Sequence, residues 1–404
     1  MSAPPRQQPL DEVLLSLSRA HQARYLEDLA ELVAIDSGSY SADGVNRVAD
    51  LVRAHLERLD FAVERVALPP HRGHRTGDLL IGRKEGRLPV ADGGRRLLLA
   101  AHMDTVFDDG AAAERPFSLD GSLAHGPGVS DDKGGLVAGL AALEILARAG
   151  IEDYDELVFL ATPDEEIGSP ASRPFIRRAA EGVHFALALE CARENGDLVI
   201  ARKGVADFRL TVTGRAAHAG IEPERGANAA LAAAHLVIAI QALNGVWEGV
   251  TLNVGVVRAG SRFNIVCPEA ELLVEIRSAT ESGMRAATGA LRRAAARPVV
   301  PGTHVGVEEL MSCPPMEDMP ASRRMLDTAQ DIGGRLGLTF GATATGGVGD
   351  ANTLAGTGVP TLDGLGPVGG ADHTPEEWLD VSSVPARVAL LASLVAALGD
   401  GRVL

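Results

Sequence analysis

Apolar and polar residues follow two rhythms in the first half of the chain. Short, wholly apolar runs at 97–101, 157–161 and 185–189 are separated by stretches such as 133–149, in which apolar residues recur every three or four positions. The short runs are typical of strands buried on both faces, and the longer spacing is typical of amphipathic helices. Strands and helices that alternate in this way predict a mostly parallel sheet covered by helices.

Helices are also expected before and after these strands. Residues 11–60 have the pattern of two amphipathic helices, with a break at Asp36-Ser37-Gly38-Ser39. Another helix is expected near 171–181, and helices over 321–336 and 384–398 return to the pattern of the first half.

The pattern changes after about residue 203. Residues 206–213 alternate like a strand with one buried face, and an Ala-rich helix follows over 228–243. The remaining elements are strands at 251–257, 271–277 and near 304–310, with a helix at 284–296. Two helices on a four-stranded antiparallel sheet make a compact α+β module. We therefore predict an α/β fold in which 203–313 is inserted between two parts of a larger domain, 1–202 and 314–404.

Length and charge narrow the class of protein. A chain of 404 residues is too long for one ordinary core, so two domains are expected. The formal net charge of −16 argues against nucleic acid or an anionic membrane as partner. No run of 18 apolar residues is present, and Met1–Leu10 lacks the apolar core of a signal peptide. Three cysteines do not suggest a disulfide framework, so a cytoplasmic location is expected.

Ionisable residues follow the predicted strands directly. His102 ends the first strand, Glu165 and Glu166 follow the second, and Glu190 ends the third. In parallel sheets ligands bind beyond the carboxyl ends of the strands, which is where these side chains are expected. Adjacent carboxylates repel each other, and a bound cation removes that repulsion. Asp104, two residues after His102, is placed on the same face of a continuing strand to accept the second ring N–H of the histidine.

Two further candidates lie in glycine-rich loops. Asp131 follows Gly126-Pro127-Gly128, and His373 follows Gly369-Gly370. Each residue also has an ordinary interpretation: Asp131 or Asp132 could cap the next helix, and an isolated loop histidine is usually structural. Taken together, however, two histidines and several carboxylates are the set that two divalent metals need for activating water. Imidazole with carboxylate favours Zn²⁺, with Co²⁺ or Mn²⁺ able to substitute.

The motifs resemble one known family, the dinuclear zinc hydrolases that include glutamate carboxypeptidase, acetylornithine deacetylase and succinyl-diaminopimelate desuccinylase. The resemblance spans nearly the whole chain and is closest to the glutamate carboxypeptidase branch. The matching motifs are HMDTV (102–106), GPGVSDDKGG (126–135), TPDEEIGS (162–169), LALE (187–190), GRAAHAG (214–220), FNIVCP (263–268), EIRS (275–278), TGGVGDA (345–351) and the loop with His373.

This resemblance implies roles for the candidate residues. Asp131 would bridge two Zn²⁺ ions, with a cis peptide bond between Asp131 and Asp132. One ion would be completed by His102 and Glu190, and the other by Glu166 and His373. Asp104 would orient His102, and Glu165 would be the general base that takes a proton from the attacking water and delivers it to the leaving amine.

The inserted module resembles the family's lid and dimerisation domain. His218 would reach the active site of the partner subunit in a homodimer and stabilise the tetrahedral oxyanion. Asn264 and Arg277 would hold the terminal carboxylate of the substrate. From the residues alone, a polar residue at a strand–helix turn is the favoured interpretation of His218. Arg277 could equally be a surface strand charge.

The resemblance implies a metal-dependent hydrolase of an amide bond next to a free carboxylate. One branch of the family carries Asp at the position of Glu190 and is aminopeptidase-like, so Glu190 favours carboxypeptidase or deacylase chemistry. Family members often carry Thr or Ser where this chain has Gly349, which removes a hydroxyl that could contact substrate. The alternatives are a deacylase or desuccinylase of a specialised small molecule and, more remotely, a non-catalytic homologue that binds ligand only.

Overall fold

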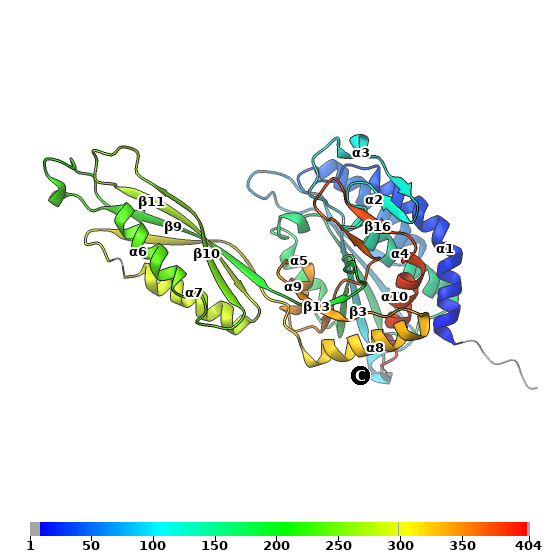
Figure 1. The fold of residues 1–404 in the computed structure, drawn as a ribbon. Helices are drawn as coiled ribbons and strands as arrows, with labels where there is room; N and C mark the ends of the chain where they lie inside the picture. The colour runs from blue at the N-terminus through cyan, green and yellow to red at the C-terminus, as the bar shows by residue number, and fades with distance from the viewer. Residues whose placement is uncertain (1–8, 298, 402–404) are drawn as a thin grey trace, which may run out of the picture. The chain divides into compact units, whose positions relative to one another are not determined.

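The computed structural model describes residues 9–297 and 299–401. These residues form two compact units (Figure 1). Unit 1 comprises the chain up to Ile200, Asp318–Ala344, and the chain from Gly349 onward. Unit 2 comprises Ala201–Glu317 and the short segment Thr345–Val348.

The central sheet of unit 1 has six strands. Their order is β1 (Ala62–Val66), β2 (Leu79–Glu85), β6 (Glu156–Thr162), β3 (Arg96–His102), β7 (Phe185–Ala188) and β14 (Thr361–Leu362). The last four of these run parallel, whereas β2 and β1 are antiparallel to their neighbours. The prediction of an α/β fold with a mostly parallel sheet and an inserted α+β module is therefore confirmed.

Helices cover both faces of this sheet because its strands are apolar on both sides. Leu97, Leu99 and Phe159 face one core, while Leu98 and Val158 face the other. The first core is closed by α1 (Leu10–Val33), α2 (Ala42–Arg58), α4 (Lys133–Ala149), α8 (Pro320–Leu336) and α10 (Val384–Gly399), and the second by α5 (Arg173–Ala179) and α9 (Asp350–Ala355). A short helix, α3 (Ala111–Glu114), also belongs to this unit.

A second, small sheet in unit 1 brings two distant loops together. Its strands, in order, are β15 (Gly369–Gly370), β16 (Trp378–Asp380), β5 (Leu123–His125) and β4 (Ser118–Asp120). Trp378 pairs with His125 in antiparallel register. Because His125 ends β5 and Trp378 begins β16, the loop after β5 and the loop before β16 are next to each other.

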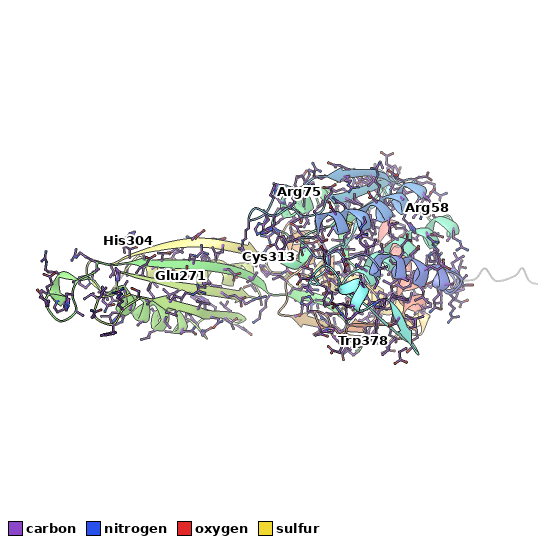
Figure 2. The ribbon with its side chains drawn as sticks, turned by 90° about the horizontal axis from the view of Figure 1, so that it is seen from above. Arg58, Arg75, Glu271, His304, Cys313 and Trp378 are labelled. Atoms are coloured by element: carbon purple, nitrogen blue, oxygen red, sulfur yellow. The ribbon has the colours of Figure 1, made fainter. Side chains whose placement is uncertain are left out.

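Unit 2 is a two-layer α+β module. Its sheet has the order β10 (Val250–Ala259), β11 (Glu269–Ser278), β9 (Gly204–Thr213) and β12 (His304–Cys313), all antiparallel. Alternate residues of β9, such as Phe208 and Leu210, pack against α6 (Ala229–Gln241) and α7 (Glu281–Ala295). Figure 2 labels Glu271 on β11 and His304 on β12.

Two further strands, β8 (Leu198–Arg202) and β13 (Ala342–Thr345), pair with each other in a two-stranded sheet.

Within the described ranges, no helix has the length and apolarity that a membrane crossing requires.

Candidate metal centre

The parallel strands bring the candidate residues to one edge of the central sheet. His102 is the last residue of β3 and pairs with Thr162, the last residue of β6. Glu165 and Glu166 follow in a short 3₁₀ turn over Glu165–Ile167, and Glu190 lies two residues after β7. The carboxyl ends of these neighbouring strands therefore converge, as the sequence pattern predicts.

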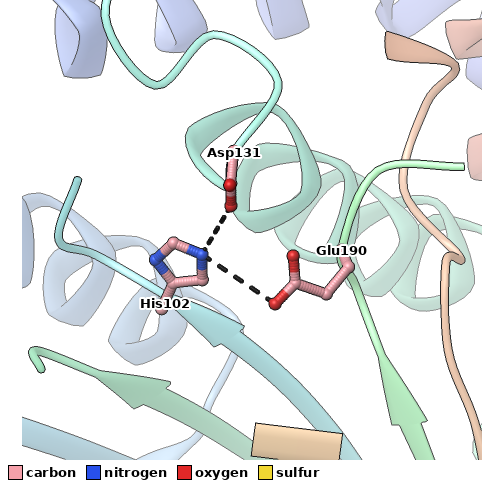
Figure 3. Close-up of side chains that lie close together, drawn as sticks. All are labelled: His102, Asp131 and Glu190. Atoms are coloured by element: carbon pink, nitrogen blue, oxygen red, sulfur yellow. Dashed lines mark hydrogen bonds and ion pairs between the residues drawn. The ribbon is translucent and has the colours of Figure 1, made fainter. Parts of the chain in front are cut away.

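One group of possible ligands contains His102, Asp131 and Glu190 (Figure 3). His102 Nε2 lies 2.9 Å from Asp131 Oδ1 and 3.9 Å from Glu190 Oε1. One nitrogen and two oxygens from three separate segments thus face a common point. The same atoms would bind a single divalent cation.

A second group contains Asp131, Glu166 and His373. His373 Nε2 lies 3.1 Å from Asp131 Oδ2 and 3.2 Å from Glu166 Oε2. Asp131 therefore takes part in both groups and offers a different oxygen to each imidazole. A carboxylate in this position can bridge two cations.

The charges and unpaired atoms of these groups fit cations. Three carboxylates face two imidazoles, and Glu166 Oε1 is buried without a hydrogen bond from any described residue. Hydrogen bonds to Asp131 and Glu166 raise the pKa of His373 to about 10. Burial opposes charge on His102, but its hydrogen bonds to Asp104 and Asp131 prevail and raise its pKa well above the usual value. The carboxylates therefore favour positive charge at both histidines, and a bound divalent cation supplies positive charge at the same place. The residues present thus fit two divalent metals.

Asp104 organises the strand ends on which the groups stand. It is fully buried. His102 Nδ1 lies 3.0 Å from the main-chain oxygen of Asp104 and 3.4 Å from its carboxylate Oδ1. The carboxylate also accepts the backbone N–H groups of Glu165 (3.1 Å) and Glu166 (3.2 Å), as well as the hydroxyl of Ser39 (2.6 Å). One side chain therefore fixes the turn that carries both glutamates, which its sequence position alone did not indicate.

Glu165 belongs to neither group of possible ligands. Burial raises the pKa of its carboxyl group well above the usual range, and the negative charges of Glu190, Asp350 and Glu166 add to this effect. A carboxylate with a raised pKa, next to a site for cations and outside their ligand set, has the properties of a proton acceptor.

The loop that carries Asp131 ends at α4. Asp132 lies at the N-cap position of this helix, but its side chain makes no capping hydrogen bond; instead Oδ2 accepts the backbone N–H of His102 at 3.2 Å. The peptide bond between Asp131 and Asp132 is cis. The structure therefore contradicts the alternative that one of these carboxylates caps the helix.

In unit 2, Asn264 and His218 lie close together. The backbone of His218 forms a bridge with Ile265, and Ala219 donates to the Asn264 carbonyl at 3.1 Å. His218 is exposed, and its Nδ1 accepts the N–H of Gly220 at 3.2 Å. The proton of the neutral ring is then on Nε2, which leaves a donor free for another molecule.

Arg277 lies near the other end of β11 from Asn264. It follows Glu269, the first residue of this strand, by eight positions, which is about 27 Å of antiparallel strand. Arg277 donates to the Gly346 carbonyl (2.8 Å) and to Glu275 (2.9 Å). The structure thus does not bring Asn264 and Arg277 together within one chain.

Sequence reasoning missed two buried carboxylates beside the centre. Asp350, at the start of α9, accepts hydrogen bonds from Thr162 and Ser169, each at 2.5 Å. Glu377 accepts three backbone N–H groups from the Asp131 loop. Asp350 lies in the TGGVGDA motif, and Glu377 lies four residues after His373. Nothing in the spacing of either residue indicates which groups it contacts.

Comparison with known proteins agrees with this geometry. Residues 98–397 match the model of peptidase family M20/M25/M40. The chain belongs to this family. Carboxypeptidase G2 from Pseudomonas sp. (strain RS-16) is 32% identical over 401 residues, which cover 98% of this chain and 94% of that protein. Acetylornithine deacetylase from Photorhabdus laumondii is 25% identical over 393 residues, which cover 92% of this chain and 96% of that protein.

Two solved peptidase structures share the fold. Aminopeptidase PepT from Bacillus cereus has a TM-score of 0.74 at 25% identity and covers 93% of this chain and 98% of its own. The M20 metallo-carboxypeptidase Sso-CP2 from Sulfolobus solfataricus has a TM-score of 0.70 at 14% identity, covering 92% and 98%. The resemblance to the family of glutamate carboxypeptidase and acetylornithine deacetylase is confirmed, and the chain is a metal-dependent hydrolase of the carboxypeptidase and amidohydrolase type.

Proposed function

We propose that this M20 hydrolase uses two Zn²⁺ ions to cleave an amide bond next to a free carboxylate, as in a C-terminal glutamate or an N-acyl amino acid. The observation that carries the proposal is Asp131, whose two oxygens face two different histidines at 2.9 and 3.1 Å. A shared carboxylate of this kind supports a pair of metal ions better than a single one. Bound Zn²⁺ supplies Lewis acidity to the scissile carbonyl and to water.

We assign the proton transfers to Glu165. Its carboxylate would take a proton from the attacking water and pass it to the departing amine. Two features support this role: the raised pKa of Glu165 and the hydrogen bond from its backbone N–H to Asp104 at 3.1 Å, which fixes its turn. Co²⁺ or Mn²⁺ are possible substitutes for Zn²⁺, since the donors are nitrogen and oxygen only.

The substrate's carboxylate would be held by Arg277 and Asn264 from two different chains of a homodimer. Because these residues lie near opposite ends of β11, a single chain cannot place both on one small carboxylate. The Nε2–H of His218, next to Asn264, would donate to the oxyanion of the partner subunit's substrate. The homodimer is thus part of the proposal, because an isolated chain would lack two of the contacts.

A pocket beside Glu166 would hold the acyl group of the substrate. A pocket of about 620 Å³ is lined there by Ser39, Tyr40, Thr105, Phe107, Asp108 and Glu166, among others. This volume lies within the usual range of small-molecule sites. It would admit acyl groups larger than acetyl.

A substrate panel tests the proposal. The Zn²⁺-loaded chain is assayed on peptidyl and N-aroyl glutamates, on N-acetyl and N-succinyl amino acids, and on the same compounds with the α-carboxylate converted to an amide. We expect hydrolysis of at least one free acid and little or none of its amide. Equal rates on acid and amide would contradict the carboxylate requirement, and no hydrolysis of any compound would contradict the proposed activity.

A further inference from the structure

We propose that Glu377 is a positioning residue for the metal centre, because its carboxylate holds the loop of Asp131 against the loop of His373. The inference rests on the proposed function, since it requires that these two residues bind metal ions.

The carboxylate of Glu377 collects three backbone donors from one loop. Oε2 accepts the N–H of Gly128 at 2.8 Å, and Oε1 accepts those of Ser130 at 2.8 Å and Asp131 at 2.9 Å. Glu377 is only 1% exposed, so water does not compete for these bonds. Since one of the donors is the amide of Asp131 itself, the carboxylate fixes the main chain from which the shared ligand projects.

The backbone of Glu377 belongs to the other loop. Its N–H donates to Thr374, the residue after His373, at 3.3 Å, and its carbonyl lies 3.1 Å from Nδ1 of His125. His125 ends β5, and the next residue along from Glu377 is Trp378, which pairs with His125. One residue thus joins the two loops through both its side chain and its main chain.

Three converging N–H groups call for a carboxylate rather than an amide. A glutamine at this position has one acceptor oxygen, and its NH₂ group would face backbone donors. At least one buried N–H would then lose its partner, and the loop would shift to relieve the mismatch. Because Asp131 gives one oxygen to each group of ligands, such a shift would weaken both metal sites at once.

The expected loss of metal affinity in a Glu377 variant can be taken from the losses that are typical of other metal centres. Loss of a group that orients a ligand typically costs 10–100-fold in metal affinity. For E377Q we therefore expect Zn²⁺ affinity to fall by about 10–100-fold at both sites. E377D keeps the charge and the two acceptor oxygens but is one methylene shorter, so it should be intermediate.

A matched control separates positioning from general stability. Asp155 also accepts a backbone N–H, from Val90 at 2.9 Å, and pairs with Arg96 at 2.6 Å. It precedes β6 and thus lies at the opposite end of the strands from His102 and Thr162, about 20 Å away. D155N should lower the thermal stability of the metal-free chain but leave Zn²⁺ affinity unchanged.

The experiment measures three quantities for the wild type, E377Q, E377D and D155N. These are Zn²⁺ affinity by competition with a chromogenic chelator, the visible absorption spectrum of the Co²⁺-loaded chain, and thermal unfolding without metal. We expect weaker Zn²⁺ binding and a changed Co²⁺ spectrum in E377Q, and partial recovery in E377D. D155N should show wild-type Zn²⁺ affinity and a wild-type Co²⁺ spectrum, with only its thermal stability lowered.

The outcomes can be told apart. If E377Q binds Zn²⁺ as tightly as the wild type, Glu377 does not position the centre, even though the proposed function stands. If neither E377Q nor E377D folds without metal, Glu377 is a general structural residue and the proposal is overturned. If the wild type itself binds no Zn²⁺, the proposed function fails, and the positioning role fails with it.

Discussion

Replacing Glu165 with glutamine removes the proposed proton acceptor while changing little else. The side chains have nearly the same size, and the backbone N–H of residue 165 can keep its 3.1 Å bond to Asp104. Glu165 is in neither group of possible metal ligands, so E165Q should still bind two metal ions at saturating Zn²⁺. The turn that carries Glu166 should also stay in place, because the Glu166 N–H bond to Asp104 does not involve the substituted side chain.

The expected size of the effect comes from the role. General-base catalysis contributes about 10²–10⁴-fold to a rate, which corresponds to about 2.7–5.5 kcal/mol in activation free energy. E165Q should therefore lose this factor in kcat, with a smaller change in KM because the ground-state contacts to the substrate remain. Hydrolysis of the best panel substrate under metal saturation measures both constants.

A matched control is E27Q. Glu27 lies on α1, is 70% exposed and pairs only loosely with Arg24 at 3.6 Å. The same loss of charge there should leave both constants unchanged. The base assignment would be refuted if E165Q kept more than about one tenth of the wild-type kcat with its metal content intact.

Three further predictions concern substrate binding, the dimer and pH. R277M should raise KM by roughly 10–150-fold on a free-acid substrate, the size of a lost hydrogen bond to a charged group, and an unchanged KM would contradict the carboxylate role. H218A and E165Q, each nearly inactive alone, should recover about one quarter of wild-type activity when co-expressed, because half of the dimers are then mixed and each has one complete site; no recovery, or a monomer by light scattering, would contradict the shared site. Burial lowers the pKa of His55 from 6.5 to about 4. Between these two pH values the histidine is protonated in the unfolded chain but neutral in the folded one. The free energy of unfolding therefore falls by about 3 kcal/mol as pH falls from 6.5 to 4. Urea unfolding of metal-free H55L should show an acid dependence smaller by that amount, whereas an unchanged dependence would rule out this cause.

The sequence predicts those parts of the fold whose physics is local. Strands β3, β6 and β7 have wholly apolar central runs that are buried on both faces, so composition alone reveals them, and α4 begins and ends where its apolar spacing does. The sequence pattern does not predict strands β1 and β2. β1 has no buried residue, carries Glu64 and Arg65, and lies at the edge of the sheet, and the last three residues of β2 are Arg83, Lys84 and Glu85.

The site is predictable to a similar degree. Five possible ligands were found because each follows a strand or a glycine-rich loop and matches a motif. Their pairing into two groups that share Asp131 is implied by the family resemblance but not by the residues alone, because it depends on three-dimensional distance. Neither the residues nor the resemblance predicts the hydrogen bonds of Glu377. They depend on the small sheet of β4, β5, β15 and β16, whose strands are only two or three residues long and leave no periodic pattern.

A Zn²⁺ titration of the metal-free chain, with bound metal and hydrolysis followed together, decides whether two metal ions share Asp131. We expect saturation at two Zn²⁺ per chain, full activity only when the second ion binds, and weakened binding of both ions in D131A. Saturation at one ion, full activity in the presence of a strong chelator, or two tightly bound ions in D131A would contradict a shared two-metal centre.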